Sequence, residues 1–246
     1  MIKYPKAPIV EAVFDIRIDP SLEVPGKEIE SLHTEVSEQY PVKEILRTFA
    51  ATIEVKEGLP SSQTEDRGII GARFWDNDKK QVCKFELNGF SFSRLKPYDI
   101  EGWEKYFPEV MRLWNIYKKR FAPRNITRVA VRCINSIEIP ASRFELSNYF
   151  VDAPKPPEGL PQIVTNFLSR LEFQNEDGSL TLITLSLQQP QKSDITPILL
   201  DIDVFRNVHF SSGDDVQLRS IFERLRTIKN EIFEASLTDK TKELFR

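Results

Sequence analysis

Residues 9–19 have the sequence Ile-Val-Glu-Ala-Val-Phe-Asp-Ile-Arg-Ile-Asp, in which apolar and charged side chains alternate. Phe14 and Ile16 fall on one side of an extended chain, whereas Asp15 and Arg17 fall on the other side. This pattern predicts a β-strand with one face in the core and one more polar face. We therefore expect a sheet whose two sides differ in chemistry.

The same alternation recurs along the chain, and segments with helical spacing separate its strands. Further strands are predicted at 45–57, 67–75, 81–87, 89–96, 125–139, 162–174, 179–189 and 196–206. Helices are predicted at 27–39, from about 108 to 121, at 143–150 and from about 215 to 235. The pairs Asn88-Gly89 and Asp177-Gly178 predict tight hairpin turns, because both residue types tolerate positive φ.

The order of these elements divides the chain into two similarly patterned halves, residues 1–122 and 123–246. Each half has a strand, a helix, three or four antiparallel strands and a long helix. We therefore predict the α+β class, with a mostly antiparallel curved sheet backed by two long helices. One continuous domain remains an alternative to two.

The amino-acid composition limits the classes of protein to which this chain can belong. The chain has 246 residues, of which 40% are hydrophobic and 11% aromatic, enough to build a core. Its formal net charge is −3, so it lacks the basic excess that drives binding to nucleic acid, and this partner is disfavoured. No apolar run approaches the roughly 18 residues that cross a bilayer. We expect a cytoplasmic protein without a membrane partner.

Cysteine, histidine and glycine usage disfavours several common chemistries. Cys83 and Cys133 lie in apolar, strand-like runs and are expected to be buried, reduced thiols. His33 lies in the predicted helix at 27–39 and His209 in a predicted turn, and two histidines give little material for a zinc site or a triad. Glycine-rich phosphate loops and the common hydrolase motifs are absent. The sequence assigns no metal and no cofactor, and it leaves open whether the protein is an enzyme.

Charged residues on the strands are the candidate site. The six residues that we single out are Glu11, Arg17, Arg128, Arg132, Asp201 and Asp203. The first interpretation is a solvated sheet face with cross-strand ion pairs. The second is a pocket in which arginines hold phosphate or carboxylate, and in which Asp201 and Asp203, two residues apart on one strand face, share Mg²⁺.

Several segments together resemble a sporadically distributed prokaryotic family of uncharacterised proteins of about this length. They are Ala7-Pro8-Ile9-Val10-Glu11-Ala12, the stretch from Trp103 to Tyr117, residues 128–135, Leu200-Asp201-Ile202-Asp203 and the tail around 233–240. The resemblance covers nearly the whole chain, but none of these motifs is a catalytic signature. It implies a prokaryotic cytoplasmic setting, with a defence or toxin–antitoxin locus as one context, and transfers no site residues.

Taken together, these features favour a non-enzymatic binding or regulatory module that recognises a protein partner or a second copy of itself as a homodimer. The alternative is a metal-dependent enzyme that binds a nucleotide or phosphate on the charged strand face. A third hypothesis, a saddle-like sheet on nucleic acid, is opposed by the interleaved carboxylates.

Overall fold

The computed structural model describes residues 3–19, 26–56, 59–98, 102–141, 144–189 and 194–246. Within these ranges, nine strands form one antiparallel sheet in the order β2-β3-β4-β5-β1-β6-β9-β8-β7. The strands are β1 (Ile9–Ile18), β2 (Val42–Lys56), β3 (Leu59–Trp75), β4 (Gln81–Glu86), β5 (Gly89–Leu95), β6 (Asn125–Ile139), β7 (Leu168–Gln174), β8 (Leu180–Leu187) and β9 (Thr196–Ser211). The helices are α1 (Lys27–Ser31), α2 (His33–Val36), α3 (Trp103–Phe121), α4 (Asp215–Ser236) and α5 (Asp239–Glu243), with a 3-10 turn at Leu146–Asn148.

β1 lies in the middle of the sheet and pairs with β5 on one side and β6 on the other. Its Phe14 lies opposite Phe92 of β5 and Val131 of β6, and all three side chains are buried. The neighbouring Asp15 points to the other face. The predicted division of this strand into an apolar and a polar face is confirmed, and it extends across the neighbouring strands.

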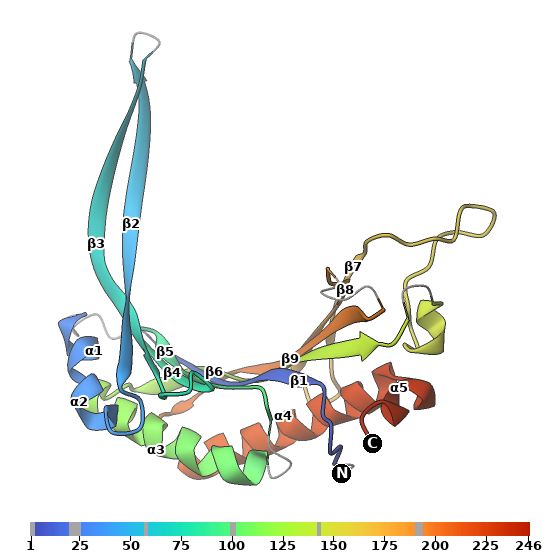
Figure 1. Ribbon diagram of the computed structural model, residues 1–246. Coiled ribbons are helices and arrows are strands. Elements are labelled where there is room, and N and C mark those ends of the chain that lie inside the picture. Colours follow the sequence, from blue (N-terminus) through green and yellow to red (C-terminus); the bar gives the residue numbers. More distant parts are fainter. Residues whose placement is uncertain (1–2, 20–25, 57–58, 99–101, 142–143, 190–193) are drawn as a thin grey trace.

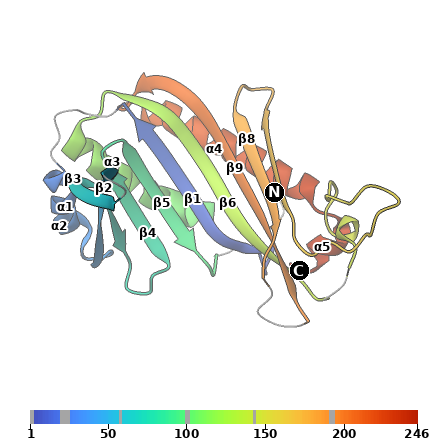
Figure 2. The ribbon, with the colours of Figure 1, turned by 90° about the horizontal axis from the view of Figure 1, so that it is seen from above.

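Helices α3 and α4 lie on one face of the sheet (Figure 1). Seen from above, the central strands β4, β5, β1, β6 and β9 lie side by side over them (Figure 2). Aromatic rings fill the space between these layers: Phe14 lies 6.3 Å from Phe107 of α3 and 5.9 Å from Phe222 of α4, measured between ring centroids. The core therefore sits between the helices and the apolar side of the central strands.

The predicted architecture of two similar halves backed by two long helices is wrong. One nine-stranded sheet dominates the described chain, and it takes strands from both predicted halves, so the fold is α+β only in the broad sense. Alternation along a sequence shows that a segment is a strand, but it does not show which strand lies beside it. Here the pairing of β1 with β6 joins segments more than a hundred residues apart, and only the folded chain decides that contact.

Several predicted boundaries also change. β3 begins at Leu59 instead of residue 67, because residues 62–67 are polar and exposed and therefore carry no alternating signal. β7 begins at Leu168 instead of residue 162, and His209 lies in β9 instead of a turn. α3 begins at Trp103 and contains Pro108, which costs one backbone hydrogen bond in a helix otherwise held by its buried aromatic face.

Two projections leave the sheet on the side opposite α3 and α4. The long β2–β3 ribbon rises from one end, and β7, β8 and the loop at residues 151–167 rise from the other (Figure 1). We call the first the ribbon and the second the C-terminal projection. The sheet face between them, which carries no helix in Figure 1, is called the open face.

Candidate functional site

The charged residues predicted from the sequence gather on the open face. A hollow of about 500 Å³ there is lined by the side chains of Glu11, Asp15, Arg17, Arg73, Trp75, Lys84, Ser91, Ser93, Arg128, Arg132 and Asp203, among others. Five of the six predicted site residues are therefore brought together across β1, β6 and β9. The sixth, Asp201, does not line the hollow but binds Arg132, 2.8 Å from the arginine Nε to its Oδ1.

Asp15 is the centre of an ion-pair network on this face and was not among the predicted site residues. Its side chain receives hydrogen bonds from Arg17 (2.6 Å from Nη2 to Oδ2) and from Arg128 (2.8 Å from Nη1 to Oδ1). Asp15 is only 8% exposed, so both arginines are attracted to a carboxylate that water reaches poorly. The available signal was its position two residues before Arg17, on the same face of the alternating strand.

The network continues in both directions from Asp15. Arg17 also donates to Glu86 at 2.8 Å, and Lys84 donates to the same carboxylate. On the other side Arg128 contacts Asp203 at 3.2 Å and stacks on the ring of Phe205, 4.4 Å from its centroid. Each of these cations is thus neutralised by a carboxylate already, and a phosphate would have to displace one of them.

Asp201 and Asp203 point to the same face, but each is held by a different arginine. Among the described residues, no group of three or more histidine, cysteine, aspartate or glutamate side chains is placed to hold a metal ion. A shared Mg²⁺ at this aspartate pair would therefore find no third carboxylate, histidine or cysteine ligand among the described residues.

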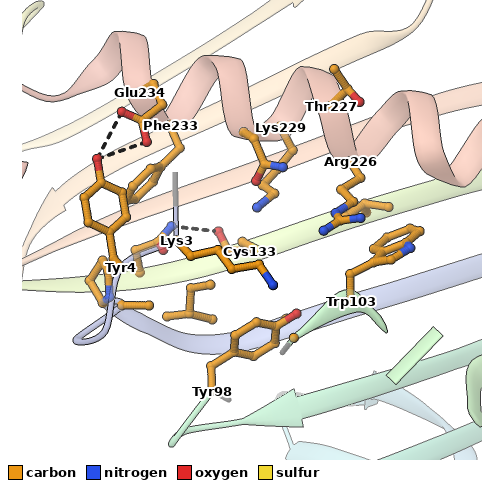
Figure 3. A pocket seen from close by; sticks show the side chains of 18 of the residues that line it. Lys3, Tyr4, Tyr98, Trp103, Cys133, Arg226, Thr227, Lys229, Phe233 and Glu234 are labelled. Atoms are coloured by element: carbon orange, nitrogen blue, oxygen red, sulfur yellow. Dashed lines mark hydrogen bonds between the residues drawn. The ribbon is translucent and has the colours of Figure 1, made fainter. Parts of the chain in front are cut away.

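A larger cavity, of about 1040 Å³, lies on the other side of the sheet (Figure 3). We call it the helix-side cavity. It lies between β1, β6, the end of α3 at Trp103 and the second half of α4, and its walls include Phe14, Tyr98 and Phe233. Sequence reasoning missed it. The available signal was the small side chains of Ala12 and Cys133 at core-facing strand positions, which leave space that larger residues would fill.

Polar side chains surround the mouth of this cavity. Tyr4 donates to both oxygens of Glu234 at 3.1 Å, and burial, reinforced by this carboxylate, raises the pKa of Tyr4 to about 12. Arg226 binds Glu104 at 3.1 Å and lies over the Trp103 ring. The cavity is therefore apolar and aromatic inside and carries both signs of charge at its rim.

No protein-family model matches the chain, and no curated protein matches it either. None of the helices in the described part of the chain has the length and apolar character that crossing a bilayer requires.

Asp203 gives the open face a pH dependence that can be measured. Burial raises its pKa, repulsion from Asp15 and Asp201 adds to the effect, and attraction to Arg128 and Arg132 opposes it. A raised pKa in the folded state means that the folded protein binds more protons, so this contribution to stability is complete below pH 3.8 and is lost as the pH rises through the folded-state pKa. Relative to Asp203→Asn, the wild type should therefore become less stable as the pH is raised above about 4.

Asp177 is the matched control, because its pKa shifts the opposite way. Burial opposes its ionisation, but hydrogen bonds from Ser179 and Arg224 outweigh burial and lower its pKa. Relative to Asp177→Asn, the wild type should lose stability as the pH falls through this range. Urea unfolding at a series of pH values measures both differences. If the stability difference between wild type and variant changed with pH in the same direction for Asp203→Asn and for Asp177→Asn, the raised pKa of Asp203 would be contradicted.

Proposed function

We propose that the protein is a non-enzymatic binding module that holds a protein partner between its ribbon and its C-terminal projection, and that this partner is a second copy of the chain. The observation that carries this proposal is where the apolar side chains are exposed. Of nine large hydrophobic residues exposed in the described ranges, eight lie on the two projections and one lies on α4. The eight are Phe49, Ile53, Ile70, Val151, Leu160, Ile163, Leu168 and Leu171.

Such a concentration is unusual for surfaces that face only water. Exposed apolar groups gathered in one region mark interaction surfaces, because burying them against a partner releases the water that they order. Both projections also end in an edge strand, β2 and β7, whose outer backbone groups have no neighbouring strand among the described residues. Each projection therefore offers apolar side chains together with backbone hydrogen-bonding groups.

A second copy fits these two projections. They lie at opposite ends of one sheet, so a two-fold axis at right angles to the line that joins them would place the ribbon of one copy against the C-terminal projection of the other. The charge of the open face between them is also compatible with a second copy of the chain. Its arginines are paired with carboxylates, so the face carries both charges in balance and would not repel an identical face.

The test is the mass of the protein in solution. We expect the wild type to form a dimer at about 100 μM, which requires a dissociation constant of about 100 μM or lower, an association free energy of about 5.5 kcal/mol or more. Phe49→Ser combined with Ile53→Ser should give a monomer, because both side chains lie on the ribbon and Ile53 is 73% exposed. Light scattering after size exclusion measures the change.

The control is Val216→Ser, which removes an even more exposed apolar side chain from α4, away from both projections. It should remain a dimer. A monomeric wild type at about 100 μM, or a dimer that survives the ribbon substitutions, would overturn the proposed self-association.

The second candidate function is the binding of a phosphate-bearing ligand in the hollow of the open face. Five cationic residues line it, and this observation favours an anion even though carboxylates pair with several of them. Pyrophosphate with Mg²⁺, added in a thermal unfolding experiment, tests this alternative directly. A ligand that binds the folded protein raises the melting temperature, so an unchanged melting temperature would count against it.

A further inference from the structure

We infer that the helix-side cavity is a binding site for an uncharged, mostly apolar small molecule. The cavity lies on the opposite side of the sheet from the open face, and the inference does not depend on the function proposed above. Three features support it: a floor of small side chains, walls that other side chains hold in place, and a mouth at which the described charges cancel.

The floor of the cavity is formed by small side chains of the sheet. Ala12 of β1 and Cys133 of β6 lie directly opposite each other in the strand pairing, and both line the cavity. The next pair on the same face, Phe14 and Val131, has larger side chains, and both are buried. Two small residues side by side therefore leave a space above the sheet that larger residues at these positions would fill.

Helix α4 lies over this floor without filling the space. Its buried side chains end at Ile228, and none of the residues 229–236, all of which the structure describes, is buried. Lys229, Phe233 and Glu234 from this part of the helix line the cavity (Figure 3). The volume that remains is about 1040 Å³, at the upper end of the range of about 300–1000 Å³ that is usual for small-molecule sites.

Aromatic rings on the walls keep the cavity open. Trp103 stacks on Phe107 with 4.7 Å between the ring centroids, and the guanidinium group of Arg226 lies over the Trp103 ring, 4.8 Å from its centroid. Phe233 packs against Phe245, with 6.1 Å between the centroids. Neighbours hold each ring in place, so a ring cannot move into the space without losing those contacts. The cavity is therefore formed before a ligand arrives, as is usual for small-molecule sites.

The charges at the mouth of the cavity cancel among the residues that the structure describes there. Three cations and three carboxylates line it: Lys3, Arg226, Lys229, Glu104, Glu231 and Glu234. Arg226 binds Glu104 at 3.1 Å, and Lys3 attracts the same carboxylate. Glu234 accepts a hydrogen bond from Tyr4 and pairs with Lys242. A charged ligand would leave water without meeting an excess of opposite charge, whereas an uncharged ligand has no such cost.

Two fluorescent probes that differ by one charge test the class of ligand. N-phenyl-1-naphthylamine is uncharged, and the wild type should bind it saturably. 8-Anilinonaphthalene-1-sulfonate has the same rings with one added sulfonate. It should bind in the cavity at least about tenfold more weakly and fail to displace the uncharged probe, because its sulfonate would lose water without a counter-charge. Fluorescence titration of each probe, and of one against the other, measures the affinities.

Substitutions that fill the cavity from its floor locate the bound probe. Ala12→Phe should weaken binding of the uncharged probe about tenfold or more, because the added ring occupies the space above the floor. The matched control is Ala130→Phe, which adds the same ring on the opposite face of the sheet and should bind the probe like the wild type. Cys133→Met, opposite Ala12, should weaken binding several-fold and decides the test if circular dichroism shows that Ala12→Phe does not fold.

Three results would overturn the inference. The first is an uncharged probe that does not bind saturably, and the second is a charged probe that binds as tightly and displaces it. The third is probe binding that the filling variants leave unchanged, or that only Ala130→Phe or the ribbon variant weakens, which would place the probe elsewhere. The ribbon variant, Phe49→Ser with Ile53→Ser, should bind the probe normally, so failure of the self-association proposal leaves this test intact.

Discussion

Replacing Phe222 with alanine is expected to lower the free energy of unfolding by about 3 to 5 kcal/mol. Phe222 on α4 is fully buried, and its ring lies 5.9 Å from Phe14 of β1 and 5.7 Å from Phe107 of α3. One ring therefore joins both helices to the central strand. Its removal leaves a cavity that neighbouring rings cannot fill, because each is already packed against other buried residues.

Urea unfolding followed by tryptophan fluorescence measures this loss, and Val216→Ala provides the control on the same helix. Val216 is 82% exposed, so its truncation should change the free energy of unfolding by no more than about 0.5 kcal/mol. Equal effects of the two substitutions would contradict the position of α4 against the sheet. The comparison separates core packing from any change in the helix propensity of α4.

Replacing Asp15 with alanine is expected to lower the free energy of unfolding by about 2 to 3 kcal/mol, less than the loss expected for Phe222→Ala. Removing one partner from a buried ion pair leaves the others charged and poorly solvated. Here two guanidinium groups, those of Arg17 and Arg128, would lose the carboxylate between them. Their side chains are partly exposed to solvent, which reduces the loss from the value for a fully buried pair.

The pair of Arg47 and Asp66 offers a matched control on the ribbon. Its atoms are 2.6 Å apart, the same distance as between Arg17 and Asp15, but both side chains are exposed. Asp66→Ala should therefore change stability very little, because water already solvates both charges. Urea unfolding at neutral pH measures both variants. A loss for Asp15→Ala no larger than that for Asp66→Ala would contradict the partly buried network on the open face.

The candidate site was partly predictable because strand alternation places charged residues on one face. Arg128 on β6 and Asp203 on β9 were selected on that basis, and they contact each other in the structure. Their partner Asp15 was not selected, since a sequence shows which face a residue occupies but not which residues lie across from it. The helix-side cavity was missed for a related reason. Small residues such as Ala12 and Cys133 create a space only when the helices above fail to fill it.

Gly89 illustrates the difference between a local and a tertiary cause. The Asn88-Gly89 pair predicted a hairpin turn, and the chain does reverse there, between β4 and β5. The structure adds a second reason for glycine at this position: a Cβ atom on residue 89 would collide with the backbone carbonyl of Ile16 on β1. A neighbouring strand, more than seventy residues earlier in the chain, therefore excludes every larger side chain.

The sequence by itself determined the approximate positions of the strands and, for β1, which side is apolar, because side chains alternate along an extended chain with a period of two residues. Only the tertiary structure decided that residues 9–18 form the centre of a single sheet, between β5 and β6. It also decided that two ends of that sheet project away from the helices. Such features depend on contacts between segments that are distant in the chain, and local periodicity carries no information about those contacts.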